Sequence, residues 1–283
     1  MQNILACVDT SSYAASVCDL AAWASRKLEL PVELLHVVQR KDAVSGRHDL
    51  SGAIGLGVKS QLLEELTQIE EADARLQIER GRVLLAAGEE HLKAAGAIGI
   101  KPLHRHGGIV ETILEREIDA RIVVIGKRGA SHEFAQDHIG SKIERVVRAS
   151  SRPILVASRA IVTPQVVVLA YDASPAADRA LERCANSPLF LGMPVHVVMA
   201  GSDDQRHRTL IDKAVAQLGE AHEVRTTLGS GRPEEVISAV VGETPGAILL
   251  MGAYGHLPLR TLIVGSTTTA MVRTVRVPVL LVR

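Results

Sequence analysis

The stretch Tyr171-Asp172-Ala173-Ser174 decides the fold, because it ends an apolar run that starts at Val166 and has a counterpart earlier in the chain. That counterpart is Val8-Asp9-Thr10-Ser11, which ends the apolar run of residues 3–8. Glycines repeat as well, as Gly126, Gly129 and Gly140-Ser141 in the first half and as Gly252, Gly255 and Gly265-Ser266 in the second. A repeat of this length indicates a duplicated domain and not a solenoid.

Apolar runs alternate with helix-like segments in both halves. Near-continuous apolar strands are typical of a sheet covered on both faces, and their alternation with helices is typical of parallel βαβ units. We expect strands at residues 3–8, 32–38, 101–105, 122–125 and 153–156, and again at 166–169, 195–199, 223–227, 248–251 and 277–282. The sequence therefore predicts an α/β fold of two Rossmann-like domains, residues 1–158 and 165–283, each a doubly wound, five-stranded, mainly parallel sheet.

The first half carries an insertion at about residues 40–95 that the second half lacks. It comprises a Gly-rich, charged loop and then a helix predicted from about residue 60 to residue 95. An apolar stripe lies along this helix at Leu62, Leu63, Leu66, Ile69, Leu76, Val83 and Leu84. Such a stripe favours a helix that covers the core, with a partner-binding helix or a lid as the alternatives.

Composition excludes several classes of function. Lys plus Arg and Asp plus Glu number 32 each, and aromatic residues make up 2%, so we expect no nucleic-acid partner. No apolar run approaches the roughly 20 residues that span a bilayer, and the N-terminus resembles no signal peptide. The three scattered cysteines favour a reducing compartment. These features predict a cytoplasmic protein without a membrane partner.

The repeated residues fall where a doubly wound sheet binds ligands, at the carboxyl ends of its strands. Glycines let a backbone approach an anion, and the start of the last helix adds unpaired N–H groups, Ser266 and Thr267. Asp172 could accept hydrogen bonds from a ribose hydroxyl or an exocyclic amine. The pattern predicts a phosphate cradle in the second half. The alternative is that the glycines only form tight turns and that Ser266 only caps the helix.

At this point a family resemblance can be stated. The second half carries Gly-x2-Gly-x9-Gly-Ser in full, and each half has a His-Val pair, His36-Val37 and His196-Val197. Over essentially its whole length the chain resembles a tandem universal stress protein of the ATP-binding branch. The resemblance implies adenine nucleotide alpha hydrolase-like domains that bind ATP or another adenine nucleotide, with accompanying Mg²⁺ left open. Asp172 and the Val197 backbone would hold the adenosine, and Gly252, Gly255, Gly265 and Ser266 the phosphates. It also implies that residues 154–156 and 279–282 pair to form an intramolecular pseudo-dimer, with a homodimer of the whole chain left open.

The first half departs from this pattern. Its weaker candidate residues are Asp9, Val37, Gly126, Gly129, Gly140 and Ser141. Ten residues separate Gly129 from Gly140, and this loop contains Glu133 and Asp137. A carboxylate about 4 Å from a phosphate charge costs about 4 kcal/mol at an effective dielectric near 20, although Lys127, Arg128 and Lys142 could offset it. We therefore expect the second half to be the main nucleotide site.

The sequence favours binding over catalysis. No evident general base surrounds the cradle, so we expect a stress-response or signalling protein with little or no turnover and with no catalytic residue. The alternatives are a non-nucleotide binding scaffold, a slow ATPase and an adenylate-forming enzyme. His104 and His106 share a strand face and could bind a metal, but without nearby Cys or acid clusters we expect no metal site.

Overall fold

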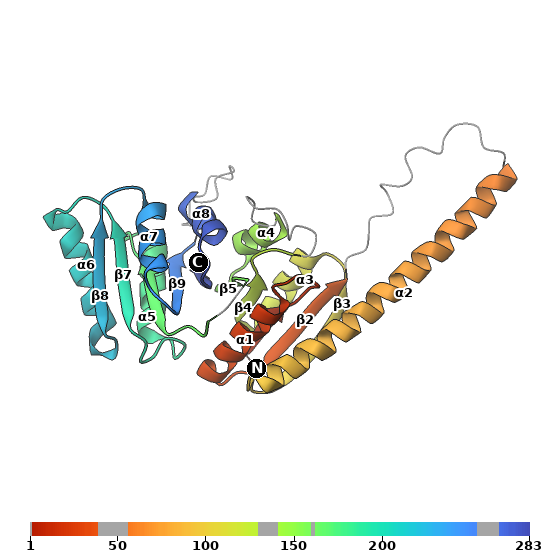
Figure 1. Cartoon of the computed structure of the whole chain (residues 1–283), viewed down its shortest axis with the longest axis horizontal. Helices are drawn as coiled ribbons and strands as arrows, with labels where there is room; N and C mark the ends of the chain where they lie inside the picture. The colour runs from red at the N-terminus through yellow and green to blue at the C-terminus, as the bar shows by residue number, and fades with distance from the viewer. Residues whose placement is uncertain (1, 39–55, 130–140, 160–161, 254–265) are drawn as a thin grey trace.

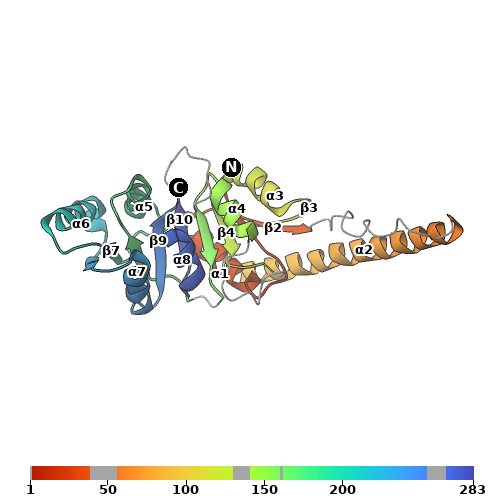
Figure 2. The ribbon, with the colours of Figure 1, turned by 90° about the horizontal axis from the view of Figure 1, so that it is seen from above.

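The computed structural model describes residues 2–38, 56–129, 141–159, 162–253 and 266–283. They form a three-layer structure with helices on both faces of one central sheet (Figures 1 and 2). The first half contains β1 (Asn3–Cys7), α1 (Ala14–Leu28), β2 (Val32–Val38), α2 (Leu56–Ala94), β3 (Ile100–His106), α3 (Ile109–Arg116), β4 (Ala120–Gly126), α4 (Ser141–Ala149) and β5 (Ile154–Ala157).

The second half repeats this order without a counterpart of the long helix. It contains β6 (Val166–Ala170), α5 (Pro175–Asn186), β7 (Val195–Ala200), α6 (Gln205–Leu218), β8 (Val224–Gly229), α7 (Pro233–Gly242), β9 (Ala247–Gly252), α8 (Ser266–Thr274) and β10 (Val279–Val282). Short 3-10 turns at Glu117–Asp119 and Gly219–Ala221 follow α3 and α6. The predicted α/β fold with five strands in each half is confirmed.

All ten strands belong to one sheet, in the order β3-β2-β1-β4-β5-β10-β9-β6-β7-β8. Neighbouring strands are parallel within each half, and β5 and β10 are antiparallel to each other. Leu155 pairs with Leu280 at the centre of that junction. The expected pairing of the last strands is confirmed, and it makes the two halves a single pseudo-symmetric body.

The strands have two buried faces because successive side chains alternate across the sheet. In β1, Ile4 and Ala6 join one apolar cluster, whereas Leu5 between them joins the other. The first cluster is covered by α1, α2, α5 and α6, and the second by α3, α4, α7 and α8. Both clusters include residues of β5 and β10, so the core is continuous from one half to the other.

Two cations add contacts across the junction of the halves. The Lys127 ammonium donates to the Val275 carbonyl oxygen just after α8, at 3.0 Å. The Arg283 guanidinium donates to the carbonyl oxygens of Arg148 and Ser150 at the end of α4, at 2.8 and 3.2 Å. Carbonyls at the end of a helix carry partial negative charge, so each cation is attracted to the carbonyl oxygens that it contacts.

Helix α2 differs from the expected covering helix. Only its last turns pack on the body, with Leu85 and Leu92 buried and with Gly81 and Gly88 close to the sheet. Of the expected stripe, Ile69, Leu76 and Val83 are exposed. Val83 lies about 200° around the helix from Gly81 and therefore on the side away from the body. The first part of α2 projects away from the molecule (Figure 1). The side chains of Leu62, Leu63 and Leu66 lie outside the described set.

Within the residues that the structure describes, no helix has the length and apolar character needed to cross a membrane. All three cysteines are free, and Cys18 and Cys184 lie in the core. Burial raises the pKa of the Cys18 thiol, and that of Cys184, to about 12. Both residues therefore remain protonated at neutral pH and act as apolar side chains.

Candidate switch-point sites

Each half of the sheet has a topological switch point, where two adjacent strands are followed by connections that run in opposite directions along the sheet. In the first half it lies between β1 and β4, and in the second between β6 and β9. Ligands in open α/β sheets bind outside the carboxyl ends of the strands at such points. Asp9 follows β1 and Asp172 follows β6, so both predicted aspartates lie at a switch point.

The two aspartates adopt the same local turn. The Asp172 Oδ1 atom accepts a hydrogen bond from the Ser174 backbone N–H at 2.9 Å, and Asp9 Oδ1 accepts one from Ser11 at 3.0 Å. Ser174 then caps α5 by accepting from the Ala177 N–H. Asp172 is exposed, whereas Asp9 is half-buried. The second half therefore presents the more accessible carboxylate.

The residue after Asp172 has an unusual backbone. Ala173 has a φ of 57°, in the left-handed region that a residue with a Cβ rarely adopts. This conformation turns the chain from β6 into the capped start of α5. Strain of this kind is found where a site must hold a fixed geometry.

Gly252 and Gly126 lie where packing leaves no room for a side chain. A Cβ on Gly252 would lie 2.4 Å from the Ala176 carbonyl carbon in the first turn of α5. A Cβ on Gly126 would lie 2.7 Å from the Tyr13 Cβ. Both glycines therefore let the first helix of their half approach the end of the fourth strand. Gly129 lies beside the carboxylate, since its Cβ would be 2.9 Å from Asp9 Oδ2.

The sheet register gives Val37 a different counterpart from the expected Val197. Cys7 pairs with Leu35, and Ala170 pairs with Val198, so Leu35 corresponds to Val198 and Val37 to Ala200. Val197 is fully buried within β7, whereas Ala200 is the last residue of that strand. The expected equivalence of the two His-Val pairs is wrong by three residues.

The backbone at these strand ends is directed toward the switch point. The carbonyl oxygens of Leu35 and Val198 accept from Val8 and Tyr171 on the neighbouring strand. Backbone groups two residues further along a strand point in the same direction, so those of Val37 and Ala200 face the space beyond the ends of β1 and β6. Val37 thus lies beside Asp9, and Ala200 lies beside Asp172.

Helices α4 and α8 begin at Ser141 and Ser266, as expected for the last helix of each half. Thr267 is half-buried, and Thr268 is buried. The buried Thr269 hydroxyl has no hydrogen-bond partner among the described residues. Gly140, Gly255, Gly265, Glu133 and Asp137 lie outside the described residues, as do the side chains of Ser141 and Ser266.

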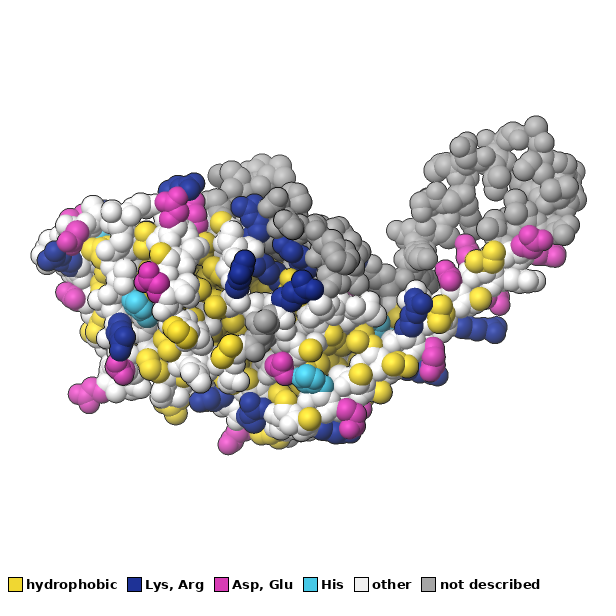
Figure 3. All heavy atoms as spheres, in the orientation of Figure 1, with side chains coloured by type: hydrophobic (Ala, Val, Ile, Leu, Met, Phe, Trp, Pro, Cys, Tyr) yellow, Lys and Arg dark blue, Asp and Glu magenta, His cyan; other side chains and the backbone are white. Residues whose placement is uncertain are grey.

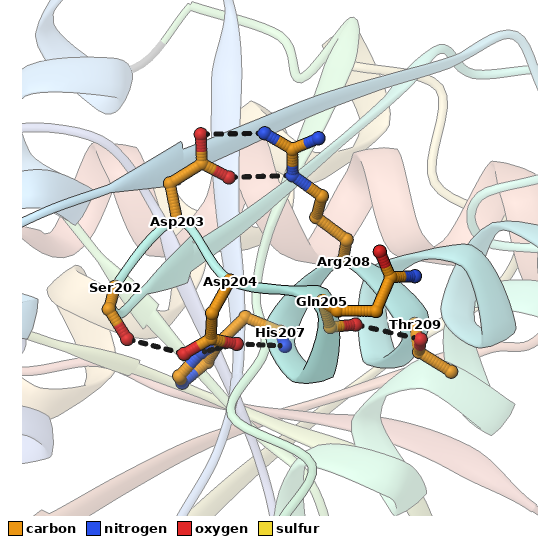
Figure 4. A network of polar contacts seen from close by, with 7 residues as sticks. All are labelled: Ser202, Asp203, Asp204, Gln205, His207, Arg208 and Thr209. Atoms are coloured by element: carbon orange, nitrogen blue, oxygen red, sulfur yellow. Dashed lines mark hydrogen bonds and ion pairs between the residues drawn. The ribbon is translucent and has the colours of Figure 1, made fainter.

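A polar network fixes the segment that follows Ala200 (Figure 4). Asp204 caps α6 by accepting from the His207 backbone N–H at 2.9 Å, and it also accepts from the Ser202 hydroxyl at 2.6 Å. These hydrogen bonds, from Ser202 first, hold the pKa of the Asp204 carboxyl well below its usual range. Asp203 forms two hydrogen bonds with Arg208, at 2.7 and 2.8 Å. The network positions the chain beside the second switch point.

Lys127 does not reach toward a ligand in the first half. Its ammonium contacts Val275 of the second half, and burial lowers its pKa to about 8. Lys127 therefore contributes to the junction of the halves, and its expected offset of the loop carboxylates Glu133 and Asp137, which lie outside the described residues, stays a prediction. Its sequence neighbourhood gives no sign of this contact, which joins residues far apart in the chain.

The predicted histidine pair is part of a row of three rings, in which His36 and His104 are stacked and His104 and His106 are tilted to each other. The rings of His36 and His104 are 5.5 Å apart, and those of His104 and His106 are 5.3 Å apart. The His36 Nδ1 atom is 2.9 Å from the Val8 carbonyl oxygen. Among the described residues, no group of three or more His, Cys, Asp or Glu side chains could hold a metal ion.

A cavity of about 310 Å³ lies elsewhere, between α1, the residue after α2 and the segment joining the halves. It is lined by Asp19, Leu20, Trp23, Arg26, Ala95, Thr163 and Pro164. Trp23 is otherwise buried in the core, as expected for a packing residue. None of the predicted ligand residues lines this cavity, so we place the candidate site at the switch points.

These features define a duplicated α/β protein with one switch-point site in each half. The model of the universal stress protein family matches residues 1–158 and 164–283. The chain belongs to this family and contains two such domains in tandem. It is 33% identical over 293 residues to the universal stress protein Slr1230 of Synechocystis, with 100% of both chains covered.

Solved structures show the same fold. A universal stress protein from Archaeoglobus fulgidus superposes with a TM-score of 0.72 at 23% identity, covering 99% of this chain and 98% of that chain. A putative universal stress protein from Pseudomonas aeruginosa superposes with a TM-score of 0.60 at 12% identity, covering 100% and 93%. Both comparisons extend over the two halves, so the tandem arrangement is shared.

Proposed function

We propose that the chain binds an adenine nucleotide, ATP in particular, mainly at the second switch point, and acts in a cytoplasmic stress response with little or no turnover. Family membership supports the general class. The position of Asp172 carries the specific assignment, because this exposed carboxylate lies at the switch point between β6 and β9. We propose residues 1–158 and 165–283 as the two domains.

The proposed adenosine contacts come from Asp172 and from the backbone of Ala200. The Asp172 carboxylate could accept from ribose hydroxyls or an exocyclic amine while one oxygen keeps its bond to Ser174. The Ala200 N–H and carbonyl oxygen can pair with a base edge. By position in the sheet, Ala200 takes the role first expected for Val197.

The proposed phosphate contacts lie at the start of α8. Ser266 begins this helix, and the N-terminus of a helix favours anions through its unpaired N–H groups and its dipole. The unpaired hydroxyl of Thr269 and the half-buried Thr267 add polar groups in the same turn. Gly255 and Gly265 keep the phosphate roles predicted from the sequence motif. Gly252 is proposed to support the site indirectly, by letting α5 pack against β9.

Calorimetry of the full chain with ATP, with and without Mg²⁺, tests the proposal. Asp172→Asn keeps an oxygen for the Ser174 bond but removes the charge, so we expect affinity to fall at least about tenfold, as when a charge-assisted hydrogen bond is lost. The matched variant Asp9→Asn should leave that affinity nearly unchanged. Equal losses in the two variants would contradict the assignment to the second half.

Native mass spectrometry of the purified chain tests the ligand class. A bound mass equal to an adenine nucleotide is expected. A different small molecule, together with no heat of ATP binding, would favour a non-nucleotide scaffold instead. Steady release of phosphate or pyrophosphate from bound ATP would show that the protein is an enzyme.

A further inference from the structure

The described side chains in the first part of α2 are exposed. Residues 64, 65 and 67–76 are all exposed, and burial begins only at Gln77 and Ile78. We call residues 56–76 the arm, which is about 31 Å long at 1.5 Å per residue. Figures 1 and 2 show it leaving the body as a straight extension of the packed part of α2.

The arm carries an apolar row that continues onto the packed part of the helix. Ile69, Leu76 and Val83 are 61%, 46% and 63% exposed and are spaced seven residues apart. This spacing places them on one side of the helix, at one of the two seam positions of a coiled-coil heptad. Gly81, Leu85, Gly88 and Leu92 contact the body from the opposite side. The row therefore faces away from the body along its whole length.

Charge is distributed unevenly along the same helix. Residues 64–74 contain Glu64, Glu65, Glu70, Glu71 and Asp73 and no Lys or Arg. Residues 75–82 contain Arg75, Arg80 and Arg82 and only one acid, Glu79. Figure 3 shows acidic, basic and apolar side chains exposed along this helix. The acidic block lies in the arm, and most of the basic block lies where the helix meets the body.

Two exposed ion pairs along α2 add little stability to the helix. The Arg75–Glu71 and Arg82–Glu79 pairs, at 3.7 and 3.5 Å, are both largely exposed. Exposed pairs of this kind contribute about 0.3–0.5 kcal/mol. Helices in proteins gain most of their stability by packing an apolar face. A partner helix on the apolar row would supply that packing.

We propose that the arm pairs with the arm of a second copy of this chain as an antiparallel coiled coil, with its two-fold axis close to Leu76. In this orientation Ile69 of each copy meets Val83 of the other, and Leu76 meets Leu76. Glu70 of each arm then lies level with Arg82 of the other, and Asp73 lies level with Glu79. A parallel pair would instead place acid against acid, so the charges specify the orientation.

The length of the helix fits this arrangement. Residues 56–75 lie on one side of Leu76, and the packed part ends at Ala94 on the other side. Each arm can therefore cover the outer face of the partner's packed segment, where Val83 is exposed. The two nucleotide-binding bodies would stand at opposite ends of the paired helices, and the switch points would remain uncovered.

Sedimentation equilibrium tests the pairing. The unmodified chain is expected to form a dimer, and Leu76→Arg should raise the dissociation constant at least about tenfold because it places two cations at the axis. The control is Leu191→Arg, at a 64% exposed apolar residue outside α2, which should change it by less than about twofold. A chain that stays monomeric, or a dimer unaffected by Leu76→Arg, overturns the proposal.

Cysteine crosslinking tests the orientation. Under mild oxidation, a mixture of Ile69→Cys and Val83→Cys chains is expected to form a disulfide-linked pair, because the two positions meet only in the antiparallel arrangement. Each variant alone should crosslink no more than the unmodified chain. Efficient self-crosslinking of Ile69→Cys would show a parallel pair and overturn the proposed orientation.

A charge exchange tests the electrostatic part. Glu70→Arg and Arg82→Glu should each weaken the dimer by placing like charges side by side. The double variant restores complementary charges between copies and should recover most of the affinity. If the loss of dimer affinity in the double variant equals the sum of the losses in the single variants, the predicted contact between the blocks is overturned.

Discussion

Gly252 shows how a glycine predicted from a ligand motif also has a packing reason to be glycine. Its place at the end of β9 follows from the repeated motif, which suggested direct contact with phosphate. The structure instead places the backbone of α5 where a Cβ would be, with Ala176 2.4 Å away. The glycine therefore acts through helix–strand packing, and a substitution there disturbs the fold before it reports on a ligand.

Substitution of Gly252 by Ala is expected to lower the free energy of unfolding by about 2 kcal/mol or more, because the methyl group would force α5 away from β9. The control is Gly242→Ala in α7, where a Cβ would meet nothing within 4 Å. That variant should gain about 0.5–1 kcal/mol from helix propensity. Urea denaturation measures both, and similar values for the two variants would refute the packing role.

The register of the second strand shows what spacing alone could have revealed. Ala200 follows Asp172 by the same number of residues as Val37 follows Asp9. The repeated His-Val pair suggests a different alignment, because Val197 lies three residues before Ala200 in β7. Counting from the aspartate identifies the strand end, whereas matching residue types does not. The contact of Lys127 with Val275 had no comparable sequence signal.

At the scale of elements, the two copies anchor their second strands by different chemistry. Glu33 in β2 is buried and accepts two hydrogen bonds from Arg116 at the end of α3, both at 2.7 Å. By register, the counterpart of Glu33 is His196, which contacts the Thr227 hydroxyl at 2.8 Å. The first copy thus uses a buried ion pair where the second uses a neutral contact.

The variant Arg116→Met is expected to lose about 3 kcal/mol of unfolding free energy, because it leaves the buried Glu33 carboxylate with Lys101, at 3.9 Å, as its one cationic partner among the described residues. The control is Arg145→Met, which breaks an exposed pair with Glu111 and should cost about 0.5 kcal/mol or less. Addition of Glu33→Gln to Arg116→Met should recover part of the loss. No recovery would mean that Arg116 acts through packing.

Element prediction succeeded for the strands and was incomplete for α2. Apolar runs bounded by Asp, Gly and Pro mark strands clearly, because burial on both faces requires continuous apolar sequence. The apolar residues of α2 lie on two sides of the helix, and only the side with Gly81, Leu85, Gly88 and Leu92 packs on the body. The expected stripe rests on large apolar side chains, whereas Gly81 and Gly88, which allow close packing, have no such side chain.

At the scale of the whole molecule, the junction of the halves contains a lysine whose charge is unfavourable. Burial first, and then Arg128 and Arg276, lowers the pKa of Lys127 from 10.5 to about 8. Between pH 8 and 10.5 the unfolded chain binds more protons at this residue than the folded chain does. The contribution of Lys127 to stability therefore rises with pH across this window.

Comparison with Lys127→Met isolates this contribution. The buried thiols of Cys18 and Cys184 have raised pKa values and give the opposite slope, but they do so in both proteins. The unmodified chain is expected to gain stability relative to the variant between pH 8 and 10, as measured by urea denaturation. A difference that stays constant over this range would contradict a titrating lysine at the junction.

The central pairing of β5 with β10 also has a consequence for synthesis of the chain. More than 120 residues separate the two strands, since β5 ends at Ala157 and β10 begins at Val279. At about 5–20 residues per second, β5 emerges from the ribosome on the order of 10 s before its partner exists. During that interval the fully apolar edge Ile154–Ala157 has unpaired backbone groups, which can pair with the same strand of a neighbouring nascent chain. Once β10 leaves the ribosome, it can pair with β5 of its own chain, provided that β5 has not already paired with a neighbouring chain.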